Sequence, residues 1–121
     1  GRDFLRADVE LNRSATVRLP DVDPGDLKRA WADILRRARL VQHHHITREE
    51  LSVREHMTLV LRSLQNRRFA AFDDLFDVQR GTPVVIVTFV ALLELARESL
   101  IEITQAEAYA PIYVRLAYTP S

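Results

Sequence analysis

The chain of 121 residues is the size of one domain with attached segments, and its 47% hydrophobic residues are enough for a modest core. Its 17 basic and 17 acidic residues give a net charge of +0, so no overall charge attracts it to nucleic acid or to an anionic membrane. The absence of cysteine excludes disulfides, thiolate chemistry and cysteine-ligated zinc, and no apolar run reaches the roughly 20 residues of a membrane-spanning helix.

The N-terminal segment predicts an extended strand. Gly1 to Ala7 has no initiator methionine, which indicates a piece of a longer protein. From Val9 to Leu19 apolar residues recur at every second position, interrupted by Arg13, as in a strand with one buried face. Pro20 and the following DVDPGD predict a turn instead of a hairpin partner. The strand therefore either pairs with later strands of the chain or adds to the surface of a partner.

The motif Asp23-Pro24-Gly25-Asp26 predicts the start of an amphipathic helix, with an N-cap, a proline at the first position and an acid in the first turn. Its apolar stripe comprises Leu27, Ala30, Trp31, Ile34, Leu35 and Ala38. Its other face carries Lys28, Arg29, Arg36, Arg37 and Arg39. Basic residues near the C-terminal end suit the helix dipole, and the alternative is a contact patch for an acidic partner or DNA.

Val41 to Leu51 reads as a connector that contains His43-His44-His45. Adjacent histidines converge poorly on one metal ion, and no carboxylate–histidine spacing of a zinc enzyme is nearby. A polar linker explains them better than a metal site. We expect no metal, no cofactor and no catalytic residues, because the chain also lacks a phosphate-binding glycine loop.

Ser52-Val53-Arg54-Glu55 is a capping box that predicts a helix to about Asn66. The residues expected to face inward are Val53, Met57, Val60, Leu61 and Leu64, with His56 near this face. Phe69 to Phe72 follows as a short strand, and Asp73 is expected to cap a small helix from Asp74 to Asp77. The pair Asp73-Asp74 could also be taken for a carboxylate dyad, but capping explains it better.

The segment Gly81 to Leu100, GTPVVIVTFVALLELARESL, is the most apolar of the chain. Thr82 is expected to be the N-cap, with Pro83 at the first helical position. Val84 to Phe89 is rich in β-branched residues and could be a buried strand, but the Thr-Pro start and the length favour a helix. Because apolar residues surround most of its circumference, this helix must be covered on more than one side.

Two strands are predicted after the long helix, one beginning at Ile101 and one from Ile112 to Leu116, joined by a turn from Ala106 to Ala110. The order of elements predicts an α+β fold, mostly α: a winged helix preceded by an extended arm and one amphipathic helix. We expect two domains, a central linker segment at residues 1–50 and a C-terminal winged-helix domain at residues 51–121.

A winged helix suggests DNA binding, but a recognition helix needs Arg, Lys, Asn or Gln that point to bases and phosphates. Pro83 to Ala96 contains none, and Arg97 is flanked by Glu94 and Glu98. The long helix therefore suits a protein partner. A DNA-binding winged-helix transcription regulator remains the alternative, based on the fold and on the basic face of residues 28–39.

Three motifs resemble one family. The runs LSVREHM (51–57), FDDLFD (72–77) and VVIVTFVALLELARESLIEITQAEAYAPIYVRL (84–116) are similar to the C-terminal region of bacterial segregation and condensation protein A, ScpA, the kleisin subunit of the Smc–ScpAB condensin. VRLPDVDPGDL (17–27) resembles the central segment of that family. The family's N-terminal domain has no match in this chain.

The resemblance implies a non-enzymatic bridging subunit, cytoplasmic and nucleoid-associated, that binds an Smc ATPase head and a ScpB dimer and holds DNA indirectly, by closing a ring. For Smc binding, the expected residues are Phe89, Leu92, Leu93, Ile112, Tyr113 and Val114. For ScpB binding, they are Val17, Leu19, Leu27, Trp31 and Ile34. Sequence alone does not separate the interface residues in these sets from the core residues.

Overall fold

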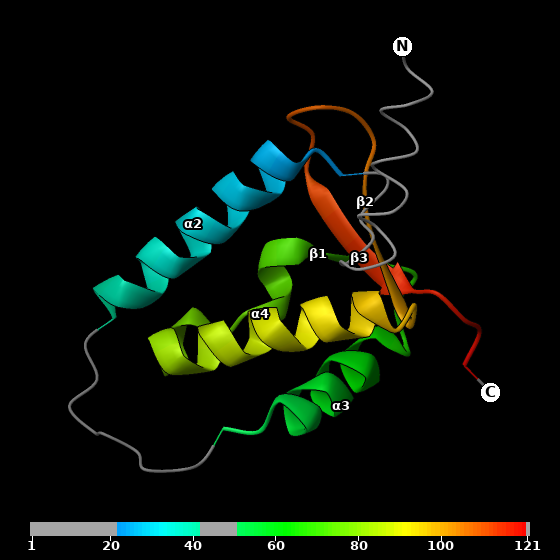
Figure 1. Cartoon of the computed structure of the whole chain (residues 1–121), viewed down its shortest axis with the longest axis horizontal. Coiled ribbons are helices and arrows are strands. Elements are labelled where there is room, and N and C mark those ends of the chain that lie inside the picture. Colours follow the sequence, from blue (N-terminus) through cyan, green and yellow to red (C-terminus); the bar gives the residue numbers. More distant parts are fainter. Residues whose placement is uncertain (1–21, 42–50, 121) are drawn as a thin grey trace, which may run out of the picture.

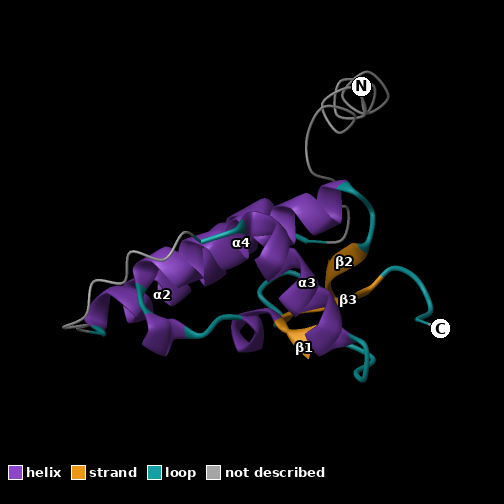
Figure 2. Ribbon diagram, turned by 90° about the horizontal axis from the view of Figure 1, so that it is seen from below, coloured by secondary structure: helices purple, strands orange, loops and turns teal. Residues whose placement is uncertain are grey.

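A computed structural model describes residues 22–41 and 51–120 of the chain. The predicted strand from Val9 to Leu19 and the three histidines of the connector lie outside these residues. Three helices pack together, α2 (Pro24–Leu40), α3 (Val53–Leu64) and α4 (Thr82–Arg97), with a small antiparallel sheet at one end (Figures 1 and 2). The predicted α+β, mostly helical class is confirmed.

Two helix starts are those that the sequence predicts. The Asp23 Oδ1 atom accepts hydrogen bonds from the amides of Gly25 (2.7 Å) and Asp26 (3.3 Å), so Asp23 caps α2. The Ser52 hydroxyl accepts a hydrogen bond from the Glu55 amide at 3.1 Å and caps α3. Helix α3 ends at Leu64, two residues before the predicted end.

The start of α4 differs from the prediction by one residue. Gly81, not Thr82, is the N-cap, and no side chain caps the helix. Gly81 has φ 91°, a conformation that glycine enters without steric cost. Because the chain turns at Gly81, Thr82 already lies inside the helix.

The short helix after the first strand also differs. A 3-10 helix, η1, spans Phe72–Leu75 and is preceded by Ala71, so Asp73 lies inside it and caps nothing. A second 3-10 helix, η2, spans Val78–Arg80 and is capped by the Asp77 carboxylate, which accepts from the Gln79 amide. The predicted Asp73 cap is therefore wrong, because the turn begins two residues earlier, at Phe72.

The sheet contains the predicted hairpin. Strands β2 (Ile101–Gln105) and β3 (Ile112–Leu116) pair antiparallel, with Ile103 opposite Val114. The two-residue strand β1 (Ala70–Ala71) pairs with the other edge of β3, which gives the order β1-β3-β2 within the described residues. One face of the hairpin, with Ile101, Ile103, Ile112 and Val114, is buried, as the alternation predicts.

A single hydrophobic core joins all of these elements, α2 included. Its largest fully buried side chains are Phe72, Ile34, Leu64, Leu92, Leu95, Val85 and Val114. Trp31 of α2 stacks on Phe89 of α4, with ring centroids 4.2 Å apart and an interplanar angle of 10°. The apolar face of α2 is therefore covered by other parts of the same chain.

None of the helices in the described ranges combines the length and the apolar character needed to cross a membrane.

Candidate functional site

Helix α4 presents an apolar strip on the side that faces away from the core. Ile86 and Val90 are 44% and 38% exposed, and Leu93, one turn further on, is half-buried. We call these three residues the α4 stripe. Their spacing of four and three residues places them in one line along the helix. Single exposed apolar residues are ordinary, but a line of three on a helix that has no charge before Glu94 makes the stripe a candidate interaction surface.

The charge around the α4 stripe is low. Between Thr82 and Leu93 the helix has no ionisable side chain. At its C-terminal end, the Arg97 guanidinium donates a hydrogen bond to Glu94, which is one turn earlier on the same helix. This pairing raises the pKa of Arg97, chiefly through the hydrogen bond. Before Arg97 the outward side of α4 therefore offers no Arg, Lys, Asn or Gln for phosphates or base edges, and the charge of Arg97 itself is paired with Glu94.

The structure divides the residues predicted for Smc binding into two groups. Leu92, Ile112 and Val114 are buried in the core of the chain itself. Phe89 is half-buried under Trp31, Leu93 belongs to the α4 stripe, and Tyr113 lies on the outer face of the sheet.

The residues predicted for ScpB binding divide in a similar way. Leu27 and Ile34 are buried in the core, and Trp31 is half-buried against Phe89. Val17 and Leu19 lie outside the described residues. The face of α2 that remains exposed is polar, because Lys28, Arg29, Asp33, Arg36 and Arg39 lie on it.

Sequence reasoning missed Ile86 and Val90. A signal for them was present, because Arg97, the first cation of the helix, lies seven residues after Val90 and eleven after Ile86. Positions separated by seven or eleven residues share a helix face, so a charged residue that must reach water identifies the outward side.

A hollow of about 830 Å³ lies on the outer face of the sheet. The ring of Phe69, which is 54% exposed, meets the Tyr113 ring edge-on there, with centroids 5.0 Å apart. Thr104 and Arg115 continue the lining, and Val22 and Asp23 lie at its border. The Arg115 Nε atom donates a hydrogen bond of 2.7 Å to the Glu102 carboxylate on β2.

One buried polar cluster connects α2 to the β2–β3 turn. The Asp26 carboxylate, 7% exposed, accepts hydrogen bonds from the Gln105 side-chain amide (2.9 Å) and the Tyr109 backbone amide (2.7 Å), and it pairs with Arg29. The Gln105 oxygen in turn accepts from the Asp23 amide at 3.0 Å. Because these donors and acceptors bond to one another within the chain, we assign the cluster a structural role: it fixes α2 to the β2–β3 turn.

The described residues offer no metal site, since no three His, Cys, Asp or Glu side chains among them converge as ligands would. His56 is buried and its Nδ1 atom lies 2.9 Å from the Ser52 carbonyl oxygen, to which it donates. Asp73 and Asp74 are exposed on the 3-10 helix η1, and the Asp73 carboxylate forms an ion pair with the Arg37 guanidinium, with 3.8 Å between Oδ2 and Nη2.

Comparison with known proteins identifies relatives along almost the whole chain. A family model described as "Segregation and condensation protein ScpA" matches residues 12–117. Proteins named "Segregation and condensation protein A" are 41% identical in Coxiella burnetii (116 residues, 95% of this chain and 44% of the relative) and 41% identical in Xylella fastidiosa strain 9a5c (115 residues, 94% and 38%).

A third relative of the same name, from Listeria monocytogenes serotype 4a, is 42% identical over 112 residues, which is 88% of this chain and 44% of the relative. The chain thus spans less than half the length of these curated relatives. The extent of the family match and the level of identity show that the chain belongs to the ScpA family of segregation and condensation proteins.

Proposed function

We propose that the chain is the part of a kleisin-type bridging subunit that docks on an Smc ATPase head and carries a ScpB-binding segment. In this proposal it serves chromosome condensation and segregation without catalysing a reaction. ATP hydrolysis belongs to Smc, and DNA is held by the closed ring of subunits. Membership of the ScpA family supports the role in chromosome segregation and condensation.

One observation carries the docking proposal: the α4 stripe is exposed on a helix side that has no charge before Arg97. A helix that lays apolar residues into a groove of a partner uses anchors at this spacing. We propose that the fold is a winged helix in which α4 occupies the place of the recognition helix and the β2–β3 hairpin forms the wing. The interface would then contact a protein through Ile86, Val90 and Leu93, with Phe89 and Tyr113 at its margins.

The ScpB proposal follows the same separation of core from surface. Leu27 and Ile34 are buried in the core of the chain and Trp31 packs on Phe89 of α4, so a partner could use them only if α2 left the core. We therefore place the ScpB contact on the segment before Val22, with Val17 and Leu19 as its apolar residues.

Titration calorimetry with an isolated Smc ATPase head tests the docking proposal. We expect Val90→Arg to weaken head binding about a thousandfold, because an unpaired charge buried in the interface costs several kcal/mol. Leu40→Arg is the matched control: Leu40 is 70% exposed on α2, and the substitution adds the same charge away from α4. A folded Val90→Arg variant that binds as tightly as the Leu40→Arg control would remove the α4 stripe from the interface.

A further inference from the structure

The positive charges of the chain are distributed unevenly among its elements. Five of the eleven arginines in the described residues have acidic partners, namely Arg29 with Asp26, Arg36 and Arg37 with Asp33, Arg97 with Glu94, and Arg115 with Glu102. Arg54 and Arg62 of α3, and Arg67 and Arg68 just after it, have none within residues 22–41 and 51–120. Arg39 of α2 and Arg80 of η2 are unpaired as well, so four of the six unpaired arginines among the described residues lie on α3 or just after it.

The arginines of α3 lie on its outward side. Arg54 and Arg62 are eight residues apart, which places them on neighbouring angles of the helix and about 12 Å apart along its axis. Thr58 and Gln65 occupy the same side and are exposed, as is Glu55, the one carboxylate of α3, which lies seven residues before Arg62. His56, Val60 and Leu64 face the core. Hydrogen-bonding side chains therefore accompany the two arginines along the full length of the helix.

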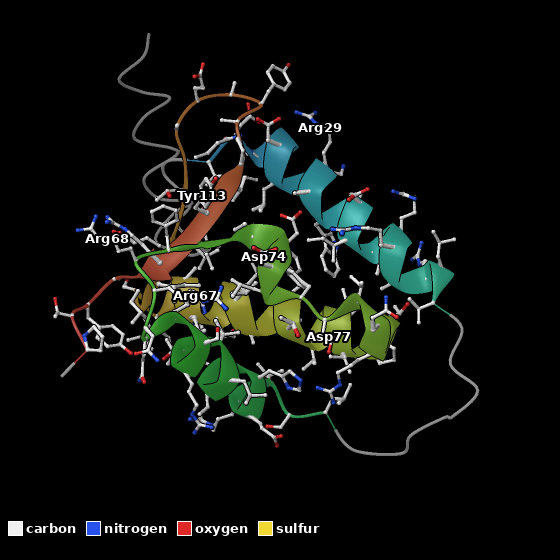
Figure 3. All side chains as sticks on the ribbon, turned by 180° about the vertical axis from the view of Figure 1, so that it is seen from behind. Arg29, Arg67, Arg68, Asp74, Asp77 and Tyr113 are labelled. Carbon is white, nitrogen blue, oxygen red and sulfur yellow. The ribbon has the colours of Figure 1, made fainter. Side chains whose placement is uncertain are left out.

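The basic surface continues beyond the end of α3. Figure 3 shows Arg67 and Arg68 on the segment that leads from α3 to the sheet, with Arg68 directed away from the body of the molecule. Arg67 lines a small pocket together with Asp74 and Asp77, so neighbouring carboxylates offset its charge. We therefore define the α3 arginine surface by Arg54, Arg62 and Arg68.

The chemistry of this surface fits phosphates better than a protein. All three charges are guanidinium groups, which bind phosphate oxygens with two parallel hydrogen bonds. The line Arg54, Thr58, Arg62 and Gln65 contains no aromatic or aliphatic anchor, and the exposed Leu59 lies beside it. Protein interfaces depend on such anchors, whereas contacts to a nucleic-acid backbone come from Arg, Thr and Gln side chains.

We propose that the α3 arginine surface binds the phosphates of duplex DNA without reading its sequence. The choice of DNA among polyanions rests on the proposed function in chromosome segregation, and the site itself rests on the charges of α3. The surface is separate from the α4 stripe, so the chain would contact DNA and a protein partner through different helices.

Fluorescence anisotropy with a labelled duplex of random sequence tests this site on the whole chain. The affinity should fall with salt between about 50 and about 200 mM with a log–log slope near −3, as expected for about three phosphates. Arg62→Gln/Arg68→Gln should reduce the size of that slope by about 2. Lys28→Gln/Arg39→Gln on α2 removes the same charge and should leave the slope unchanged.

Three outcomes would overturn the proposal: no binding of the duplex by the unaltered chain at low salt, equal losses in the two double variants, or equal binding of an RNA duplex. Smc-head titrations on the same preparations keep the two proposals separate. Loss of head binding in Val90→Arg with unchanged DNA binding supports both sites. If the unaltered chain binds DNA but not the head, the proposed function is contradicted, whereas the proposed DNA contact of the α3 arginine surface is supported.

Discussion

The indole of Trp31 lies flat on the ring of Phe89, with centroids 4.2 Å apart, and this contact joins α2 to α4. Phe76 and Phe72 complete the group, because Phe76 meets Trp31 at 5.9 Å and Phe72 meets Phe89 edge-on at 6.3 Å. Four aromatic rings from α2, α4 and the region of η1 thus pack as one cluster. The stability of α2 and that of α4 are therefore coupled.

Removing the indole should destabilise the whole folded unit. We expect Trp31→Ala to lower the free energy of unfolding by about 3 kcal/mol, since the ring leaves a cavity beside Phe89. Trp31→Phe retains an aromatic ring and should cost clearly less. Urea denaturation followed by far-UV circular dichroism measures both, and equal losses for the two variants would show that the stacked ring contributes little.

The buried carboxylate of Asp26 gives a second prediction. Asp26→Ala leaves the partly buried Tyr109 N–H without its acceptor and removes one of the two acceptors of the Gln105 amide, so we expect a loss of about 2 kcal/mol in the free energy of unfolding. Asp33→Ala on the same helix breaks only exposed ion pairs and should cost far less stability than Asp26→Ala. Similar values for the two variants in urea titrations would contradict the assigned role of Asp26.

Substitutions at Leu92 and Val90, two residues apart on α4, should affect different properties, the first stability and the second partner binding. Leu92 is fully buried, so Leu92→Ala should cost about 3–5 kcal/mol of stability. Val90 is 38% exposed, so Val90→Ala should cost less than about 1 kcal/mol while it weakens binding to the Smc head. Thermal denaturation and calorimetry with the head measure the two effects. A large stability loss in Val90→Ala would assign this residue to the core.

The end of α4 offers a stabilising substitution. Ser99 has φ 62°, its N–H donates to the Ala96 carbonyl, and the Leu100 N–H donates to Leu95, which together form a Schellman motif. We expect Ser99→Gly to raise stability by about 1 kcal/mol, because glycine adopts this conformation without strain. Ser99→Ala keeps the strain, so its melting temperature should not rise, and a gain there would assign the effect to the lost hydroxyl.

Asp33 should make a small, pH-dependent contribution to stability. A hydrogen bond from Arg36, aided by Arg37, lowers the pKa of the Asp33 carboxyl below its ordinary value. The folded state therefore favours the ionised form, and the stabilisation is present above the unfolded pKa and lost as the pH falls through the folded one. The difference in melting temperature between the unaltered chain and Asp33→Asn should be small near neutral pH and vanish in acid. A difference that grows in acid would contradict this assignment.

Local motifs made much of the fold predictable. The caps at Asp23 and Ser52 depend on side chains that reach amides two or three residues away, so the sequence contains the whole interaction. The alternation in β2 and β3 likewise predicts both the hairpin and its buried face. Where backbone conformation decided the outcome, the predicted N-cap was displaced, by one residue for α4 and by two residues for η1.

The outward side of α4 was harder to predict than the fold. In α4 nearly every residue is apolar, so periodicity does not show which side faces the core, and Leu92 was grouped with Leu93. The side is decided by Trp31, Phe72 and the hairpin, which come from distant parts of the chain. The apolar face of α2 posed the same problem, because a stripe that suits a partner also suits α4.

The central position of β3 has a consequence for synthesis on the ribosome. Both β1 and β2 pair only with β3 in the described part of the chain, and β3 is made after all the helices. Until residues 112–116 have left the exit tunnel, the helices have no completed sheet to close their core, and the α4 stripe is one apolar surface among several. A nascent chain stopped before Ile112 would therefore be a client for chaperones and not a competitor for the partner.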